Sequence, residues 1–333
     1  MSEAVPDTFR AYRVHNDDEG YRAGVDSIGL DDLDDGDLTI RVSHSGINYK
    51  DALAATGKGK IMRRFPMVGG IDVAGTVVSS GSERFSAGDE VLVTGAGLSE
   101  TRDGGFTEFL RLDSRWALPV PDGLDALEAM TIGTAGFTAA LSLYRMEISG
   151  QKPEHGPIAV TGATGGVGSV AVDILAGAGY QVHAISGKEE HFGWLAALGA
   201  EECISRHELE WTGKPLESAR WAGAIDCVGG DLLAGLCTAI KPWGNVAACG
   251  LAGGIGLKTT VMPFIIRGVS LIGIDSPLCP YEIREAVWAR LASDWKPRNF
   301  GLIRNRVVGL DDLDGIFDGM LEGNSLGRIV VKM

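Results

Sequence analysis

A glycine-rich turn between an apolar strand and a helix constrains this chain more than any other feature. Residues 158–161 form an apolar run, and the seven residues that follow, 162–168, contain four glycines. Glycines let the backbone turn tightly and approach a pyrophosphate, while free N–H groups at the start of the next helix face the anion. Residues 167–178 are predicted to form that helix and 181–186 a second strand, so the turn belongs to a βαβ unit that binds a dinucleotide. The residues of the turn that we expect to contact the dinucleotide are Thr164, Gly165, Gly166, Val167 and Gly168.

The end of the second strand indicates which dinucleotide binds. A carboxylate at this position normally accepts hydrogen bonds from the adenosine ribose of NAD, but this chain has Ser186, Gly187 and Lys188 there. A hydroxyl, a small residue and a cation suit a 2′-phosphate, and Arg206 supplies a second positive charge nearby. We therefore expect NADPH as the cofactor. The alternative is that both cations are solvated surface residues, because two glutamates directly after Lys188 weaken the local positive field.

Length, charge and cysteine content limit the class of protein. The chain has 333 residues, 45% of them hydrophobic, which is enough for two domains of ordinary size. Thirty basic and 44 acidic residues give a net charge of −14, which disfavours non-specific binding to nucleic acid or an anionic membrane. The five cysteines form no CxxC pair and the N-terminus lacks a signal peptide pattern, so we expect a protein of the reducing cytoplasm. Residues 126–146 are apolar but interrupted by Glu128 and two glycines, and are expected to form a buried helix rather than a membrane span.

Hydrophobic periodicity divides the chain into two domains. Short alternating runs dominate residues 1–125 and predict a β-rich domain. Over residues 126–278, helices alternate with near-continuous apolar strands, as in a doubly wound parallel α/β sheet of the Rossmann type. Residues 279–333 return to a helix over 280–292 and a strand over 328–332. We expect this tail to rejoin the first domain.

This organisation resembles the medium-chain dehydrogenase/reductase superfamily over nearly the whole chain. The segments that carry the resemblance are SGINYKDAL at 45–53, GKGKI at 57–61, FPMVGGIDVAGTV at 65–77, GTAGFTA at 133–139, WAGAID at 221–226, AACGLAGG at 247–254 and TTVMPFI at 259–265. They are similar to the zinc-free, quinone-oxidoreductase-like branch that includes bacterial acrylyl-CoA reductases. The resemblance implies that the β-rich domain is a GroES-like catalytic domain. It also implies a homodimer that pairs at the apolar strand 269–274, which is predicted to end the parallel sheet.

The resemblance further implies chemistry without zinc. Zinc alcohol dehydrogenases of the superfamily have a cysteine ligand where Ser45 stands, and a Gly-His-Glu motif where this chain has Gly70, Ile71 and Asp72. Zinc needs thiolate, imidazole or carboxylate ligands in a tetrahedral arrangement, which serine and isoleucine do not provide. We therefore expect no metal. The acceptor must then spread the incoming negative charge itself, as the activated double bond of an α,β-unsaturated thioester does.

By resemblance, the segment 48–51 faces the nicotinamide. We expect the hydroxyl of Tyr49 to bind the substrate carbonyl oxygen or the cofactor, and the amide of Asn48 to provide a further donor. Lys50 and Asp51 are expected to pair with each other. The alternative for Tyr49 is that its ring only packs against the cofactor.

Other cofactor contacts follow from the resemblance or from positions at the carboxyl ends of parallel strands, where doubly wound sheets bind ligands. Thr134 and Thr138 begin the helix that lies beside the nicotinamide in the family, although residues of this type also cap and pack helices. Cys227 and Cys249 are interpreted as small core residues rather than nucleophiles. The remaining contacts that we expect are Val228, Gly250, Leu251, Ile265, Ser276 and Asn324.

A basic run indicates the substrate. Residues 58–64 contain four positive charges in an otherwise acidic chain, and Lys60, Arg63 and Arg64 are expected to meet the phosphates of a coenzyme A thioester. A solvated basic turn is the alternative. The predicted function is NADPH-dependent reduction of an α,β-unsaturated thioester, with acrylyl-CoA giving propanoyl-CoA. Two alternatives stay open: an NADPH-dependent quinone or enone oxidoreductase, and a non-catalytic NADPH-binding protein.

Overall fold

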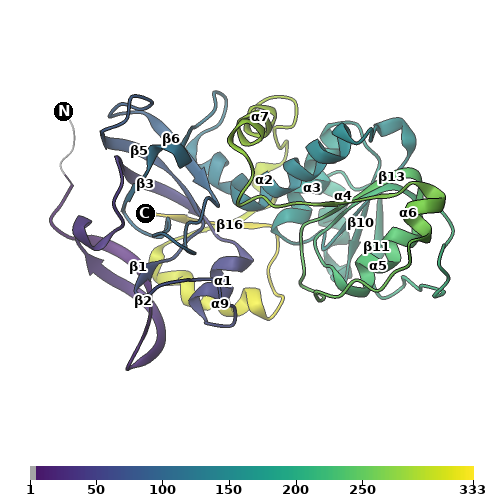
Figure 1. Ribbon diagram of the computed structural model, residues 1–333, viewed down its shortest axis with the longest axis horizontal. Helices are drawn as coiled ribbons and strands as arrows, with labels where there is room; N and C mark the ends of the chain where they lie inside the picture. Colours follow the sequence, from purple (N-terminus) through teal and green to yellow (C-terminus); the bar gives the residue numbers. More distant parts are fainter. Residues whose placement is uncertain (1–4) are drawn as a thin grey trace. The chain divides into compact units, whose positions relative to one another are not determined.

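The computed structural model describes residues 5–333, which form two compact units (Figure 1). The first unit extends to Thr134 and resumes with Arg304–Met333, and the second unit is Ala135–Ile303. These boundaries differ from the predicted division at residues 125 and 278. The difference arises from the positions of two helices, α2 and α7.

The first of these helices, α2 (Ala126–Ile148), begins in the first unit and ends in the second. Gly133 interrupts it with φ +51° and ψ −161°, outside the helical region. Within residues 5–333, α2 is long and apolar enough to cross a membrane by composition, yet 78% of its most apolar window is buried inside the protein. The prediction of a buried helix is confirmed, but the predicted single helix is broken.

The second helix, α7 (Tyr281–Leu291), was predicted to belong with the β-rich domain and instead packs in the second unit. Arg284 donates to the carbonyl oxygen of Ser276 at 2.7 Å and lies 4.7 Å above the ring of Phe137. Trp288 stacks on the same ring at a centroid distance of 6.2 Å. These buried aromatic contacts hold α7 to the second part of α2.

The first unit contains two sheets. The seven-stranded sheet has the order β15-β16-β3-β5-β6-β8, with β7 also paired to β3. Its strands are β3 (Leu38–Gly46), β5 (Asp72–Ser80), β6 (Glu90–Thr94), β7 (Phe109–Leu112), β8 (Leu118–Pro119), β15 (Arg304–Val308) and β16 (Arg328–Lys332). The three-stranded sheet consists of β1 (Phe9–Asp17), β2 (Gly20–Ile28) and β4 (Met67–Val68). Since β16 pairs antiparallel with β3, the predicted return of the last strand to the first domain is confirmed.

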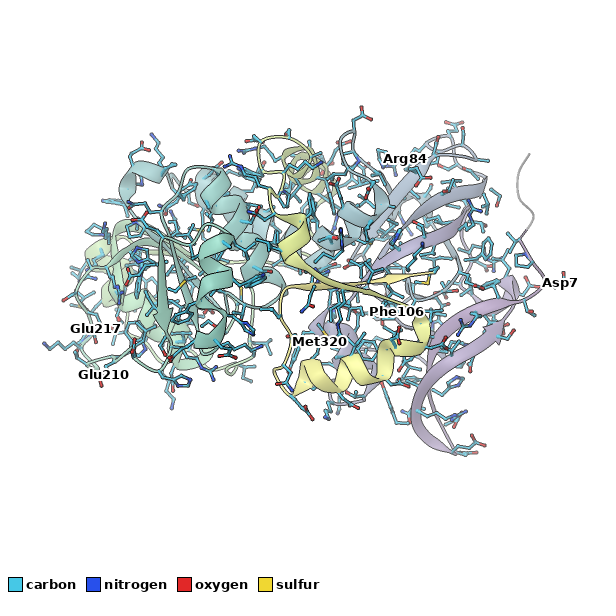
Figure 2. All side chains as sticks on the ribbon, turned by 180° about the vertical axis from the view of Figure 1, so that it is seen from behind. Asp7, Arg84, Phe106, Glu210, Glu217 and Met320 are labelled. Atoms are coloured by element: carbon cyan, nitrogen blue, oxygen red, sulfur yellow. The ribbon has the colours of Figure 1, made fainter. Side chains whose placement is uncertain are left out.

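Short helices cover the core of the first unit. They are α1 (Tyr49–Ala55), α9 (Leu313–Leu321), η1 (Leu30–Asp32), η2 (Ser114–Trp116) and η5 (Leu310–Asp312). Phe106 packs against Tyr12 and Phe317 at centroid distances of 6.5 and 6.1 Å, and Met320 lies against the same cluster (Figure 2). This aromatic core holds α1 and α9 together, and α1 carries the candidate catalytic segment.

The second unit is a doubly wound parallel sheet with the strand order β11-β10-β9-β12-β13-β14. The strands are β9 (Ile158–Thr161), β10 (Val182–Ser186), β11 (Glu202–Ser205), β12 (Trp221–Asp226), β13 (Ile240–Ala248) and β14 (Ser270–Gly273). The chain runs outward from β9 to β11 and then returns to β12, so the order reverses between β9 and β12, where ligands of such sheets bind. The predicted fold class is confirmed. The apolar strand β14 ends the sheet as predicted, whereas its pairing with a second copy stays a prediction.

Helices flank this sheet. They are α3 (Gly166–Gly177), α4 (Phe192–Ala197), α5 (Gly230–Ala239), α6 (Met262–Arg267), α8 (Phe300–Ile303), η3 (Pro153–His155) and η4 (Glu189–His191), in addition to α7. The predicted helix at 167–178 corresponds to α3, and the predicted strand at 181–186 corresponds to β10. The βαβ unit is therefore confirmed to within one residue at each end.

Candidate active site

The glycine turn joins β9 to α3 in a conformation that excludes side chains. A Cβ added at Gly168 would lie 2.3 Å from the carbonyl oxygen of Gly162 and 2.7 Å from the Cα of Ala163, both of which are backbone atoms. Gly162 itself has φ +59°, in the left-handed region. Gly165 is the extended N-cap residue of the twelve-residue helix α3. The turn therefore leaves bare backbone at a helix N-terminus, which fits a pyrophosphate.

The structure brings the four residues predicted for the 2′-phosphate to one corner of the second unit. β10 and β11 pair in register with Ser186 opposite Ser205. The backbone N–H of Lys188 donates to the hydroxyl of Ser186 at 3.1 Å, and the N–H of Arg206 donates to the Ser186 carbonyl at 2.9 Å. The Arg206 side chain lies against Gly187, where an added Cβ would be 2.5 Å from its Nε. A side chain at position 187 would therefore require the Arg206 side chain to move.

Two acidic residues, Glu189 and Glu190, lie beside this corner. Glu189 accepts a hydrogen bond from the Ser205 hydroxyl at 2.6 Å, which holds its carboxylate on β11. Partial burial lowers the pKa of Lys188, and Glu190 opposes that shift. Glu190 therefore lies close enough to favour the charged form of the Lys188 ammonium.

A buried carboxylate orders the loop that follows β12. Asp226 is fully buried and accepts hydrogen bonds from the Thr161 hydroxyl at 2.6 Å and from the N–H of Gly229 at 2.7 Å. Gly250 fits tightly beside this loop, since an added Cβ would lie 2.0 Å from the carbonyl oxygen of Cys227. The loop therefore has a fixed conformation at the carboxyl edge of the sheet.

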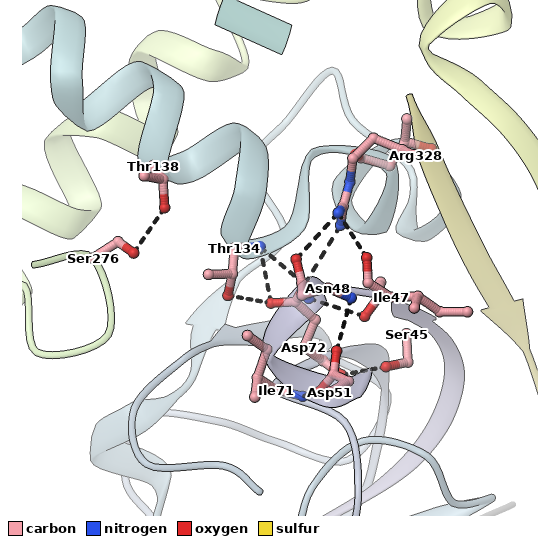
Figure 3. A network of polar contacts seen from close by, with 12 residues as sticks. Ser45, Ile47, Asn48, Asp51, Ile71, Asp72, Thr134, Thr138, Ser276 and Arg328 are labelled. Atoms are coloured by element: carbon pink, nitrogen blue, oxygen red, sulfur yellow. Dashed lines mark hydrogen bonds and ion pairs between the residues drawn. The ribbon is translucent and has the colours of Figure 1, made fainter. Parts of the chain in front are cut away.

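The other predicted cofactor contacts of the second unit lie on the loops and helices around this edge. Val228 follows β12 in the ordered loop, and Leu251 and Ile265 are exposed. The hydroxyl of Thr138 donates to that of Ser276 at 2.7 Å, and both side chains are buried (Figure 3). The structure pairs these two residues, and their contact with a dinucleotide stays a prediction.

In the first unit, a second buried carboxylate organises the candidate catalytic segment (Figure 3). Asp72, at the start of β5, is 0% exposed. It accepts hydrogen bonds from the N–H of Thr134 at 2.9 Å, from the Thr134 hydroxyl at 2.5 Å and from the amide of Asn48 at 2.7 Å. A Cβ added at Gly133 would lie 2.5 Å from the Asp72 carboxylate. The break at Gly133 therefore allows the backbone of α2 to approach the Asp72 carboxylate.

Arg328 completes this cluster, and sequence reasoning missed it. The side chain is 2% exposed and its Nη2 lies 3.7 Å from Asp72. Its Nε donates to the backbone carbonyl oxygen of Thr131 at 2.9 Å. Its Nη1 donates to the backbone carbonyl oxygen of Ile47 at 2.8 Å and to the side-chain amide oxygen of Asn48 at 3.1 Å. One indication of this role was present in the sequence, because Arg328 is the first residue of a strand whose next three residues are apolar.

This network assigns Asn48 a positioning role and leaves no amide hydrogen for a substrate. The amide nitrogen donates to the Gly46 carbonyl at 3.2 Å and to Asp72, and the amide oxygen accepts from Arg328. Asn48 is the N-cap residue of α1, so it fixes the start of that helix. Donation from Asn48 to the substrate stays a prediction, and it would require one of these bonds to be exchanged.

Tyr49 is the first residue of α1, and its side chain is 45% exposed. Among the contacts of residues 5–333, its hydroxyl has no hydrogen-bond partner, so the group is available to a ligand. The predicted pairing of Lys50 with Asp51 is wrong. Lys50 pairs with Glu100, and Asp51 accepts the N–H groups of Asn48 and Ile71 at 2.8 and 3.0 Å. Burial and the nearby Asp72 raise the pKa of Asp51 to about 7.

The basic run separates into two parts. Arg64 forms ion pairs with Asp34 at 2.6 Å and Asp103 at 3.0 Å. Lys60 and Arg63 are exposed, and their side chains have no ion pair with any of residues 5–333. Contact of all three residues with a phosphate stays a prediction, and Lys60 and Arg63 have no acidic partner within the described residues to compete with it.

Two predicted cofactor contacts lie in the first unit. The Thr134 hydroxyl donates to Asp72, so its hydrogen is already used. Asn324 lies in an exposed turn after α9 and donates to Glu322 at 3.1 Å. Contact of Thr134 or Asn324 with a dinucleotide stays a prediction.

The positions that carry zinc ligands in related enzymes do not fit zinc in this chain. Ser45 is buried and donates its hydroxyl hydrogen to the Asp72 carbonyl at 2.6 Å, and Ile71 offers no donor atom. The Asp72 carboxylate is occupied by Thr134, Asn48 and Arg328, as described above. Residues 5–333 contain no group of three or more His, Cys, Asp or Glu side chains suited to a metal.

Two protein families match this chain, one within each of the two units. Residues 34–122 match the profile of the alcohol dehydrogenase GroES-like domain, and residues 166–293 match that of the zinc-binding dehydrogenases. The chain is 46% identical to the putative quinone oxidoreductase YhfP of Bacillus subtilis, over 98% of this chain and 99% of the relative. It is 45% identical to the acrylyl-CoA reductase AcuI of Ruegeria pomeroyi, over 98% of this chain and 99% of the relative.

Solved structures of related oxidoreductases have the same fold over nearly the whole chain. The yhdH oxidoreductase of Salmonella enterica in complex with NADP is 46% identical, with a TM-score of 0.94 over 97% of this chain and 99% of that chain. The crystal structure of Bacillus subtilis yhfP, with NAD bound, has a TM-score of 0.95 at 45% identity, over 98% of this chain and 100% of that chain.

Proposed function

Because the chain belongs to the medium-chain dehydrogenase/reductase family and is an oxidoreductase, we propose that it reduces the activated C=C bond of α,β-unsaturated thioesters with NADPH. Acrylyl-CoA is the proposed substrate and propanoyl-CoA the product. The relatives carry both acrylyl-CoA reductase and quinone oxidoreductase names, so the choice of acceptor rests on this chain's own residues.

The corner formed by Ser186, Gly187, Lys188 and Arg206 is the observation that carries the choice of NADPH. It offers a hydroxyl, a small residue and two cations, and no carboxylate where a ribose of NAD would need one. The solved relatives hold NADP in one case and NAD in the other, so they support a nicotinamide dinucleotide of either kind. The charge of this corner favours the phosphorylated one.

The residues of the chain would divide the work between binding and orientation. The glycine turn would bind the pyrophosphate through backbone N–H groups, and Tyr49 would hold the carbonyl oxygen of the thioester through its free hydroxyl. Bound NADPH would supply the hydride that reduces the C=C bond. Asp72, Arg328 and Asn48 would act indirectly, since they fix the start of the helix that carries Tyr49.

Replacing Tyr49 with phenylalanine tests the first of these roles. A hydrogen bond to developing negative charge contributes about 1.5–3 kcal/mol, so Tyr49→Phe is expected to lower kcat with acrylyl-CoA by roughly 10-fold or more. NADPH absorbance measures the rate, and Tyr144→Phe, on α2, serves as a control that keeps full activity. A decrease of less than about threefold, or ~0.65 kcal/mol, would leave ring packing as the role of Tyr49.

Substitutions in the basic run test whether the acceptor is a coenzyme A thioester. Combined Lys60→Ala and Arg63→Ala substitutions are expected to raise the KM for acrylyl-CoA by about 2- to 30-fold, because each exposed ion pair contributes about 0.2–1 kcal/mol. The KM for an uncharged quinone should not change. Lys152→Ala with Lys214→Ala removes the same charge from exposed positions elsewhere and should leave both values unchanged.

The quinone is the decisive comparison in that experiment. A quinone carries no phosphate, so the loss of Lys60 and Arg63 cannot weaken its binding through lost ion pairs. Equal increases in KM for both acceptors would remove the basic run as a coenzyme A contact. The quinone or enone oxidoreductase alternative would then be preferred.

A further inference from the structure

Two thiols meet at the carboxyl edge of the parallel sheet in the second unit. β12 and β13 pair with Asp226 opposite Ala248, so the residues that follow each strand, Cys227 and Cys249, continue the register. Both are free thiols and both are partly buried. The Sγ of Cys249 lies 3.8 Å from the Sγ of Cys227.

This placement brings the two thiols close to the geometry of a disulfide. A disulfide joins sulfurs about 2.05 Å apart and requires Cα atoms roughly 4.4–6.8 Å apart. Neighbouring strands of a sheet lie about 4.8 Å apart, within that range. The backbone N–H of Cys249 donates to the Asp226 carbonyl at 2.9 Å, which keeps the two chains in register beyond the last paired residues. The two sulfurs, 3.8 Å apart, would have to approach by about 1.7 Å to form the bond.

The thiol pair lies directly under the candidate dinucleotide site. A Cβ added at Gly162, the first glycine of the turn, would lie 3.4 Å from the Cβ of Cys227. The N–H of Cys227 donates to the Thr161 hydroxyl at 3.0 Å, and the carbonyl oxygen of Cys227 is the atom that Gly250 approaches most closely. A new bond between the sulfurs would thus alter the packing of both the glycine turn and the loop after β13.

We propose that Cys227 and Cys249 form a modification site, in which a two-electron oxidant such as a peroxide or an azo oxidant joins them in an intramolecular disulfide. With hydrogen peroxide, the thiolate of Cys249 attacks one oxygen, which gives a sulfenic acid and releases hydroxide. The thiolate of Cys227 then attacks that sulfur, and a second hydroxide leaves. The two protons lost by the thiols convert both hydroxides to water, so two thiols and one peroxide give one disulfide and two waters.

The order of these steps follows from the surroundings of the sulfurs. The hydrogen bond from Cys249, together with burial, raises the pKa of Cys227 well above its ordinary value. Because the thiolate is the reactive form, the raised pKa disfavours Cys227 as the thiol that attacks the peroxide, and we assign that step to Cys249. The expected consequence of the disulfide, which rests on the proposed function, is weaker binding of NADPH.

Peptide mapping after oxidation with diamide, an azo oxidant, tests the site itself. Cleavage before Asp226 and Asp231 separates Cys227 from Cys249, so a bond between the two peptides is recognised by mass spectrometry. We expect this crosslink in the wild type, its loss on treatment with dithiothreitol, and its absence in Cys249→Ser. Cys203→Ser, on β11, is the matched control and should still form the bond. Loss of thiols without this crosslink, or no reaction at all, would overturn the proposal.

Dinucleotide affinity tests the consequence separately. Nicotinamide fluorescence should show the Kd for NADPH increasing at least fivefold in the oxidised wild type and remaining unchanged in oxidised Cys249→Ser. A mapped crosslink with an unchanged Kd would show that the bond does not reach the dinucleotide site. If the reduced protein does not bind NADPH, the proposed function is wrong, and the peptide map alone then decides the thiol pair.

Discussion

Removing the two cations at the end of β10 is expected to erase most of the preference of the protein for NADPH over NADH. Hydrogen bonds to charged groups contribute about 1.5–3 kcal/mol each, so Lys188→Ala combined with Arg206→Ala should reduce the ratio of the two kcat/KM values by ~10²- to 10⁴-fold. The Arg206 side chain packs on Gly187, and the backbone of Lys188 is held by Ser186. Kinetics with the two dinucleotides measure the change.

The same experiment separates a phosphate site from a solvated surface. Lys214→Ala removes an exposed cation from the same unit and should leave the ratio within about twofold of the wild type, because screened surface charges act weakly at a distance. The effect of the double substitution should fall almost wholly on NADPH, with little change for NADH. An unchanged ratio would show that Lys188 and Arg206 are solvated cations without a ligand.

The second large effect is expected on stability, from Arg328→Ala. Removing one partner of a buried ion pair costs about 3–5 kcal/mol, because the other charge stays buried without compensation. Here the substitution leaves Asp72 unpaired and deprives the carbonyl oxygens of Thr131 and Ile47 of their donor. Urea unfolding at neutral pH measures the loss in the free energy of unfolding.

An exposed arginine from a neighbouring strand provides the control for that experiment. Arg306 lies on β15 with its side chain exposed, so Arg306→Ala should change the free energy of unfolding by about 0.5 kcal/mol or less. Arg328→Lys keeps a charge but loses the fork that reaches several acceptors, and should be intermediate. A loss below about 1 kcal/mol in Arg328→Ala would contradict the organising role of the buried cluster.

Local patterns predicted the elements of the fold well, because strand and helix periodicity is contained within a few neighbouring residues. The strand at 328–332 and the βαβ unit around the glycine turn are examples. The two compact units divide at other residues than the predicted domains for a tertiary reason. Periodicity shows that 281–291 is helical, but only contact with Phe137, far away in the sequence, shows which core this helix joins.

The candidate site follows the same division. The glycine turn and the Ser186 corner could be predicted because each is a short segment with a recognisable chemistry. The Asp72 cluster could not, since Arg328 and Asn48 are 280 positions apart and meet only when β16 pairs beside β3. Adjacency in sequence misled the pairing of Lys50 with Asp51, because consecutive side chains of a helix point in different directions.

The most direct test of the account is the absorbance of NADPH on mixing the purified protein with acrylyl-CoA, with and without a metal chelator. We predict that NADPH is oxidised in a one-to-one ratio with the propanoyl-CoA formed, faster than with a quinone, and at the same rate when the chelator is present. Reduction of a quinone with no oxidation of NADPH by acrylyl-CoA or other enoyl thioesters, or loss of activity in the chelator, would contradict it.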